Sequence, residues 1–183
     1  MSRNFLLYLE IAITTTMSFV LSCTPLQLFN SALDLSLGFI PIAILSIRRG
    51  ILPAFCAGTL WGILSILIGK AYFLTTTQVL IEYPIAFAFG SLLGLFSLKI
   101  KTKPCPIFWI VLASFVGSVA RWSWHFIAGV IFWGSYAPKG WNPYTYSFIM
   151  NGTSCFINAI MLSIILIIFV KKSKFILMSV DNF

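Results

Sequence analysis

Long apolar runs separated by short polar stretches make up most of the 183-residue sequence. A helix rises about 1.5 Å per residue, so about 20 apolar residues cross the hydrocarbon core of a membrane. The runs therefore predict six membrane-spanning helices, near residues 5–23, 35–47, 51–69, 78–98, 107–133 and 147–170. The second run is short for a crossing, and Pro41 within it, with Asp34 just before it, predicts a tilted or partly irregular element.

The composition is that of a membrane protein. Hydrophobic residues make up 60% of the chain and charged residues only 9%, whereas soluble domains carry about 25% charged residues. We predict an all-α integral membrane protein in which residues 1–183 form one compact bundle, a single membrane domain. The four cysteines show neither metal-ligand nor CxxC spacing, so we predict no metal site and no cofactor.

The basic residues predict the orientation of the chain. The net charge of +8 would suggest nucleic-acid binding in a soluble protein, but these residues lie almost wholly between the apolar runs. With six crossings, nine of the twelve fall on the side of both termini, only Lys70 and Lys139 fall on the other, and Arg121 lies within a span. Because positive charge collects on the cytoplasmic side, we predict a multi-pass protein of the bacterial plasma membrane with both termini in the cytoplasm and no nucleic-acid partner.

Small residues recur four apart in three of the predicted helices. Gly58 with Gly62, and Gly90 with Gly94, permit close contact between helices, and packing within the chain is the expected use. In the first helix, small polar residues at this spacing form either an internal seam or a docking face for another membrane protein: Thr14, Ser18 and Ser22.

One stripe of unusual residues runs along the fifth predicted helix. Its members are four apart and therefore share a face: Arg121, His125, Gly129 and Trp133. Three other spans place Trp61, Glu82 and Asn151 in the same outer half of the bilayer. Above them lies a loop at 133–147 that is dense in tryptophan and tyrosine.

This polar cluster has two interpretations, since ionisable side chains within a span usually face each other or an interior cavity. One is a buried ion pair between Glu82 and Arg121, with His125 as a neighbour and the aromatic residues as an interfacial belt. The other is a pocket open to the outside, where a carboxylate and aromatic faces recognise a small, flat, polar ligand that can be cationic. Tyr146, Asn151 and His125 would then supply directional hydrogen bonds. The residues alone leave both interpretations open.

Several segments together resemble the thiamin-specific substrate-binding (S) components of energy-coupling factor (ECF) transporters. They are DLSLG, SIRRG, LWGIL before GKAYFL, IEYPIAF, and the long block WHFIAGVIFWGSYAPKGWNPYTYSFIMNG at residues 124–152. The resemblance implies a six-helix membrane protein that binds thiamin at its outer side and has no ATPase of its own. It also implies partners, namely a transmembrane coupling protein and two cytoplasmic ATPases that drive delivery of the vitamin inward.

The resemblance further implies roles for individual residues. Glu82 corresponds to the carboxylate that binds the aminopyrimidine, and His125 and Trp133 correspond to residues around the thiazolium. Arg121 stands where the family can carry lysine, and we expect it to neutralise Glu82 or to hydrogen-bond within the pocket. The remaining substrate-binding residues implied by the resemblance are Trp61, Tyr83, Gly129, Tyr146 and Asn151.

Two departures from the family pattern concern the first outer loop and the first helix. The family can carry a tryptophan lid just before the DLSLG segment, where this chain has Ala32 and Leu33. In the family, alanines four apart on the first helix dock the coupling protein, and this chain has the Thr14–Ser22 series at comparable spacing.

Two alternatives to a thiamin-binding subunit stay open from the sequence. The ligand could be another flat heterocyclic vitamin or a thiamin precursor, although a precursor without the thiazolium would leave Trp133 and His125 less to bind. A protein of another class would be an intramembrane enzyme with His125 and Glu82 as acid and base. No positioned nucleophile is found, so we predict no catalytic residue.

Overall fold

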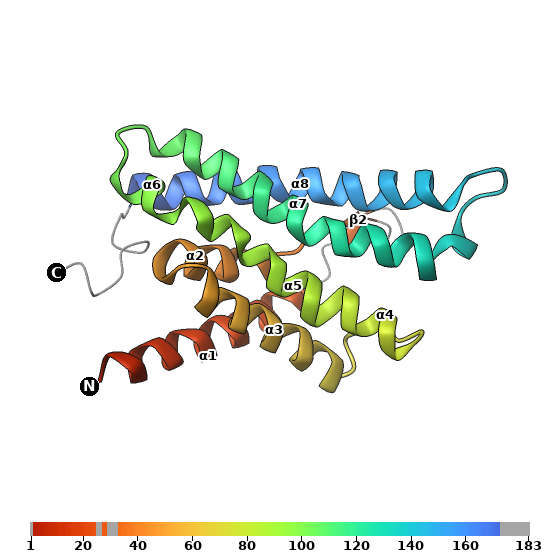
Figure 1. Ribbon diagram of the computed structural model, residues 1–183, viewed down its shortest axis with the longest axis horizontal. Helices are drawn as coiled ribbons and strands as arrows, with labels where there is room; N and C mark the ends of the chain where they lie inside the picture. Colours follow the sequence, from red (N-terminus) through yellow and green to blue (C-terminus); the bar gives the residue numbers. More distant parts are fainter. Residues whose placement is uncertain (1, 25–26, 29–32, 173–183) are drawn as a thin grey trace.

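The computed structural model describes residues 2–24, 27–28 and 33–172, and most of them are helical (Figure 1). The chain begins with α1 (Arg3–Ser22), followed by an antiparallel pairing of β1 (Gln27–Leu28) with β2 (Leu33–Asp34). α2 (Phe39–Arg49) and α3 (Ile51–Leu67) follow. After the fourth span, described below, come α7 (Pro106–Phe132), the 3-10 turn η3 (Gly134–Tyr136) and α8 (Pro143–Lys172). The all-α prediction is confirmed, apart from the two-residue β pairing, which the sequence did not predict.

The fourth predicted span is one continuous helical run, Thr76–Thr102, whose turn type changes along its length. Its successive elements are α4 (Thr76–Leu80), the π-helical turn η1 (Ile81–Ile85), α5 (Ala86–Phe89), the 3-10 segment η2 (Gly90–Phe96) and α6 (Ser97–Thr102). Pro84 lies within η1; a proline lacks an N–H, and its ring clashes with the carbonyl four residues earlier in a regular α-helix. The wider π turn accommodates this proline.

The helices form two sides with the irregular span between them (Figure 1). α7 and α8 lie antiparallel along the long axis on one side, and α1, α2 and α3 form the other. The run Thr76–Thr102 packs against α2, α3 and α7. α1 begins and α8 ends at one end of the molecule, whereas the 133–142 connection lies at the opposite end.

Four helices are long and apolar enough to cross a membrane, namely Asn4–Ser22, Thr76–Thr102, Pro106–Phe132 and Pro143–Lys172. α3 is a shorter apolar helix of 17 residues. α2 has only 11 residues and begins at Phe39, not at the predicted residue 35, and Phe39, Ile42 and Ile47 are fully buried. The element itself is a regular α-helix, and residues 35–38 of the predicted span lie outside it. Pro41 fits in its first turn, where the N–H groups have no partner within the helix.

Both glycine pairs pack within the chain, as predicted. A Cβ on Gly58 would meet the Phe87 carbonyl oxygen at 2.6 Å, and a Cβ on Gly94 would meet the Ser46 carbonyl oxygen at 3.0 Å. Gly62 lets α3 approach the π turn so closely that a Cβ there would lie 2.5 Å from Pro84 Cα. The backbone that carries Glu82 is therefore held against α3.

Two of the three small polar residues of α1, Thr14 and Ser18, lie in an internal seam, which was one of the two uses left open by the sequence. Thr14 and Ser18 are buried within the chain, and Thr15 between them donates to the Ala57 carbonyl of α3 at 3.3 Å. Ser22 is exposed, but its Oγ accepts from Trp61 Nε1 at 3.3 Å. The hydrogen bonds of Thr15 and Ser22 join α1 to α3, whereas among the described residues the buried Ser18 Oγ has no hydrogen-bond partner.

The end of the molecule that holds the start of α1 is also its basic end. Glu10 of α1 forms ion pairs with Arg48 (3.2 Å) and Arg49 (2.7 Å) at the end of α2. Lys101 of α6 donates to the Arg48 carbonyl at 3.0 Å. Lys171 and Lys172 close α8 at the same end, which agrees with the predicted cytoplasmic side.

Candidate substrate-binding site

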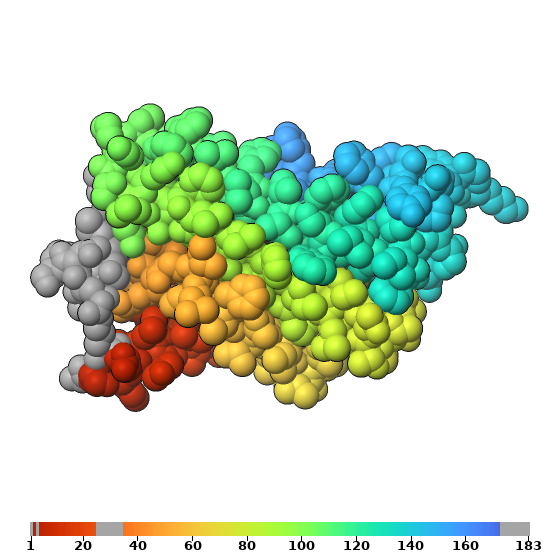
Figure 2. Space-filling model, viewed as in Figure 1, coloured from red at the N-terminus to blue at the C-terminus, as the bar shows by residue number. Residues whose placement is uncertain are grey.

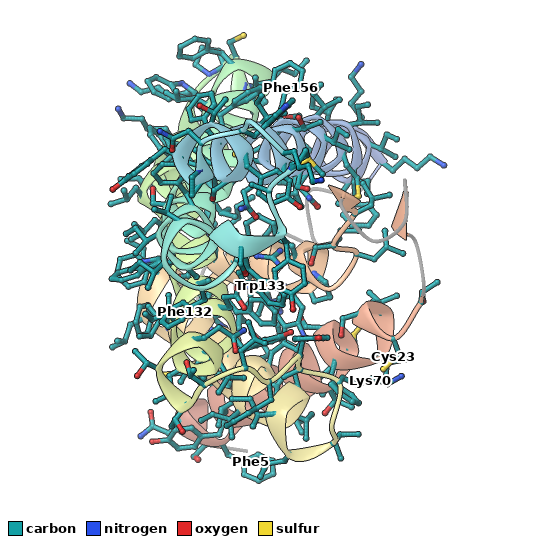
Figure 3. All side chains as sticks on the ribbon, turned by 90° about the vertical axis from the view of Figure 1, so that its right-hand side faces the viewer. Phe5, Cys23, Lys70, Phe132, Trp133 and Phe156 are labelled. Carbon is teal, nitrogen blue, oxygen red and sulfur yellow. The ribbon has the colours of Figure 1, made fainter. Side chains whose placement is uncertain are left out.

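The carboxylate of Glu82 joins two helical spans toward the end of the molecule opposite to the start of α1 and the end of α8. Its Oε1 accepts a hydrogen bond from Trp133 Nε1 at 2.8 Å, and its Oε2 accepts one from Gln78 Nε2. Figure 3 views the molecule from this end and shows Trp133 toward its middle, with Phe132 at the periphery. Glu82 lies in the π turn and Trp133 directly follows the last residue of α7, so this bond joins residues that are 51 positions apart in the sequence.

Aromatic side chains surround this hydrogen bond. The ring of Trp133 lies 5.1 Å from that of Tyr72 and 5.3 Å from that of Tyr136, measured between centroids. Tyr83 follows Glu82, and its hydroxyl accepts from the Tyr72 N–H at 2.8 Å. The space-filling view shows the segments around residues 70–80 and 130–136 in contact at this end (Figure 2).

Arg121 lies in a second group, built on Phe87. The guanidinium of Arg121 stands 4.7 Å from the Phe87 ring, 5.5 Å from Trp61 and 5.4 Å from Phe39. Trp61 is 1% exposed and stacks on Phe87 with 4.0 Å between centroids. Arg121 is therefore a buried cation held against aromatic faces.

The expected neutralisation of Glu82 by Arg121 is wrong. Within the described residues, the hydrogen bonds to the Glu82 carboxylate come from Gln78 and Trp133, and no ion pair joins it to Arg121. The physical reason is position, because the stripe on α7 places Arg121 three turns below Trp133, at the level of Phe87. The interpretation as a Glu82–Arg121 ion pair is thereby set aside.

His125 lies between the two groups. Its ring is 6.3 Å from that of Phe87, and among the described residues its buried Nε2 has no hydrogen-bond partner. Buried polar atoms are nearly always paired, by protein groups, by water or by a ligand. His125 therefore offers one hydrogen-bonding atom that a bound molecule could satisfy.

Gly129 brings α7 and α8 together beside the same region. A Cβ at Gly129 would collide with Ser147 Oγ and would lie 2.9 Å from Asn151 Nδ2. Asn151 Nδ2 donates to Ser147 Oγ at 3.1 Å, and that hydroxyl donates to the Phe126 carbonyl at 2.9 Å. Tyr146 precedes Ser147 in the first turns of α8 and is half-buried.

The comparisons with known proteins agree with this arrangement. The profile of the Thiamine transporter protein (Thia_YuaJ) family matches residues 8–178. The chain belongs to this family. It is 38% identical over 172 residues to Thiamine transporter ThiT of Lacticaseibacillus paracasei (87% of this chain and 84% of that one). It is 32% identical over 160 residues to Thiamine transporter ThiT of Bacillus subtilis, with 83% of each chain covered.

A solved structure supports the fold of this thiamine transporter protein. ThiT from Listeria monocytogenes superposes with a TM-score of 0.92 at 39% identity, covering 97% of this chain and 100% of that chain. The chain is thus a multi-pass protein of the bacterial cell membrane and a transporter protein, not an enzyme. The acid–base hypothesis for His125 and Glu82 is accordingly set aside.

Sequence reasoning missed two residues of the candidate site. Gln78 is fully buried and bonded to Glu82, and Phe87 carries contacts to Trp61, Arg121 and His125. The signal for Gln78 was its position four residues before Glu82 on one helical face. Phe87 had no distinguishing signal in an apolar run. The lid position, Ala32, lies outside the described residues.

Proposed function

We propose that this chain is the thiamin-binding subunit of an ECF importer and captures the vitamin beside Glu82. The observation that carries the proposal is the Trp133–Glu82 hydrogen bond of 2.8 Å, which places a carboxylate beside an aromatic side chain in a thiamine transporter protein. Thiamin combines an aminopyrimidine, which can donate to a carboxylate, with a flat cationic thiazolium. The Glu82 carboxylate would accept from the amino group, and the neighbouring aromatic rings of Trp133 and Tyr72 would attract the cationic ring.

The carboxylate keeps room for the ligand. An ionised carboxylate offers about four acceptor positions, and Trp133 and Gln78 use two of them. The remaining positions would accept from the pyrimidine amino group. Tyr146 and Asn151 on α8 would fix the orientation of the ligand from the other side.

The cationic ring would lie among the aromatic residues. Trp133 and His125 would face the thiazolium, whose attraction to an aromatic face is worth about 2 kcal/mol when desolvated. Arg121 carries a like charge, but it is held deeper, against Phe87 and Trp61. This deeper position would weaken the repulsion between the Arg121 guanidinium and the thiazolium.

The proposed partners are a transmembrane coupling protein and two cytoplasmic ATPases. Of the four long apolar helices, α1 has the smallest share of residues buried inside the chain, and Figure 1 places it at the edge of the molecule. On its outer face Ala12 and Thr16 are exposed four residues apart, and the Thr16 hydroxyl is satisfied by the Ala12 carbonyl at 3.0 Å. This small-residue face suits close docking of a partner helix, in place of the buried Thr14 and Ser18.

Fluorescence titration of the purified chain with thiamin tests the ligand, with Glu82→Gln alongside. Trp133 would lie against the vitamin, so saturable quenching of part of the six-tryptophan emission is expected for the wild type. A hydrogen bond to a charged group contributes about 1.5–3 kcal/mol, so the variant should bind about ten- to hundred-fold more weakly. No saturable response from folded wild-type protein, checked by calorimetry, would overturn the assignment.

Uptake assays in cells lacking their own thiamin transport test the partners. The chain alone should bind thiamin at the cell surface without accumulating it, and co-expression with an ECF coupling protein and its ATPases should restore ATP-dependent uptake. Replacing Ala12 with Leu should weaken uptake while leaving thiamin binding unchanged, because the side chain is exposed on α1 and lies outside the site. Energised uptake by the chain alone would contradict the proposed division of labour.

A further inference from the structure

Gln78 is a fully buried polar side chain whose amide group makes three hydrogen bonds. Its Nε2 donates to the Glu82 carboxylate and, at 3.1 Å, to the Tyr72 carbonyl. Its Oε1 accepts from the Leu74 N–H at 3.0 Å. Burial of an amide is costly unless its hydrogen bonds are made, and here both N–H groups and the oxygen are used.

The orientation of this amide is fixed by the chemistry of its neighbours. Two acceptors, the Glu82 carboxylate and the Tyr72 carbonyl, face Nε2, and one donor, the Leu74 N–H, faces Oε1. A flipped amide would set its oxygen against two acceptors and its N–H groups against a donor. Gln78 therefore presents an N–H to Glu82 in one direction only.

The second donor to Glu82 is tied to the same loop. The Tyr72 carbonyl is bonded to Gln78, and the Tyr72 ring packs on Trp133, whose Nε1 donates to Glu82. The Tyr72 N–H is in turn bonded to the hydroxyl of Tyr83. Gln78 thus acts on the carboxylate directly and, through Tyr72, on the indole that holds its other oxygen.

We propose that Gln78 is a positioning residue that sets the specificity of thiamin recognition. It holds the Glu82 carboxylate so that the free acceptor positions point at the pyrimidine amino group. The inference rests on the proposed function, because it assigns the amino group to Glu82. It predicts that Gln78 contributes to affinity only for ligands that can donate a hydrogen bond there.

Two substitutions of Gln78 and one matched control separate this role from a purely structural one. Gln78→Met keeps the length of the side chain and removes its hydrogen bonds. Gln78→Glu keeps an acceptor for the Leu74 N–H, but it replaces the N–H donor that faces Glu82 with a second carboxylate oxygen. Thr75→Val is the control, because Thr75 Oγ1 accepts from the Gln78 backbone N–H at 3.1 Å and does not contact Glu82.

The measurement is the ratio of dissociation constants for oxythiamin and thiamin, determined by fluorescence or calorimetry on each full-length protein. Oxythiamin carries a carbonyl oxygen in place of the pyrimidine amino group, so at that position it accepts a hydrogen bond and cannot donate one to Glu82. The ratio compares two ligands on one protein sample, so it does not depend on the folded fraction. Thermal unfolding of each variant reports its stability separately.

The expected result is that both Gln78 variants lose thiamin affinity by about ten-fold or more, while their affinity for oxythiamin changes by less than about three-fold. The preference for thiamin then collapses, and Thr75→Val retains it. Parallel losses for both ligands, with the ratio unchanged in Gln78→Met and Gln78→Glu, would overturn the proposal. A wild type that fails to bind thiamin, or a Glu82→Gln variant that binds and discriminates like the wild type, would instead refute the proposed function.

Discussion

At the scale of single residues, Glu82 receives its hydrogen bonds from two neutral side chains. The N–H groups of Gln78 and Trp133 satisfy its oxygens without supplying a positive charge, and Arg121 is held against Phe87. Glu82 is half-buried, and withdrawing an ionised carboxylate from water is costly unless a cation compensates it. A cationic ligand would supply that charge, so the residue chemistry favours thiamin over a neutral heterocycle.

Gly129 provides a residue-scale prediction. In Gly129→Ala the new methyl group would press on Ser147 Oγ and on Asn151 Nδ2, which are bonded to each other and to the Phe126 carbonyl. Overpacking of this kind costs about 1–3 kcal/mol of stability and displaces the side chains beside the candidate site, so the thermal midpoint should fall and thiamin should bind more weakly in a calorimetric titration.

The matched control for this prediction is Gly152→Ala on α8. A Cβ at Gly152 would meet only Trp122 Nε1, at 3.8 Å, which is an ordinary contact. The control should therefore bind thiamin as the wild type does. Equal affinities for the two variants and the wild type would show that the Ser147–Asn151 group does not belong to the binding site.

The residue chemistry was only partly predictable from the sequence. Polar residues in an apolar run are conspicuous, so Glu82, Arg121 and His125 could be singled out without coordinates. Their pairing could not, because Glu82 and Arg121 are oppositely charged and sequence gives no distance between them. The choice of Trp133 as a partner depends on where α7 ends relative to the π turn.

At the scale of elements, the π turn Ile81–Ile85 links the packing of the bundle to the site. It contains Pro84, carries Glu82 and Tyr83, and lies directly against Gly62 of α3. A π turn adds a residue to the helical turn and rotates the residues after it about the helix axis. The turn thus sets the directions of Glu82 and Phe87 relative to each other.

Gly62→Ala tests that link. A methyl group there would meet backbone atoms, Pro84 Cα at 2.5 Å and Tyr83 C at 2.5 Å, which cannot move as a side chain can. We expect α3 and the π turn to separate, with a loss of about 1–3 kcal/mol in stability and a weaker affinity for thiamin. A lower thermal midpoint together with a higher Kd would support the link.

Ile63→Ala is the control on the same helix, because Ile63 is 40% exposed and faces away from this contact. It should retain the affinity for thiamin. If Gly62→Ala matched this control in both midpoint and Kd, the close approach would not be what holds Glu82 in place.

The boundaries and turn types of the elements show how far the sequence pattern predicts the fold. The long spans follow from apolar length, and α7 and α8 lie within a few residues of the predicted 107–133 and 147–170. The irregular turns of Thr76–Thr102 do not follow from an apolar run, although Pro84 was visible. The π turn around Pro84 packs directly against Gly62 of another helix, where a side chain would collide with its backbone, and the apolar run does not reveal this contact.

At the scale of the whole molecule, the cluster of basic residues and the candidate binding site lie toward opposite ends. Glu10, Arg48, Arg49 and Lys101 form a bonded basic cluster where α1 begins, whereas the Glu82–Trp133 bond lies toward the other end. Because basic residues collect on the cytoplasmic side, we predict that the candidate site faces the outside. This polarity is what an uptake protein requires, since the substrate must be captured before it is carried inward.

Cysteine labelling in intact cells tests this orientation. In a chain whose four cysteines are replaced by serine, single cysteines are introduced at Lys139, between α7 and α8, and at Lys103, between α6 and α7. Both positions are exposed. A membrane-impermeant maleimide should label Lys139→Cys in intact cells and Lys103→Cys only after permeabilisation. The reverse pattern would place Glu82 on the cytoplasmic side and would turn the proposed capture step into a release step.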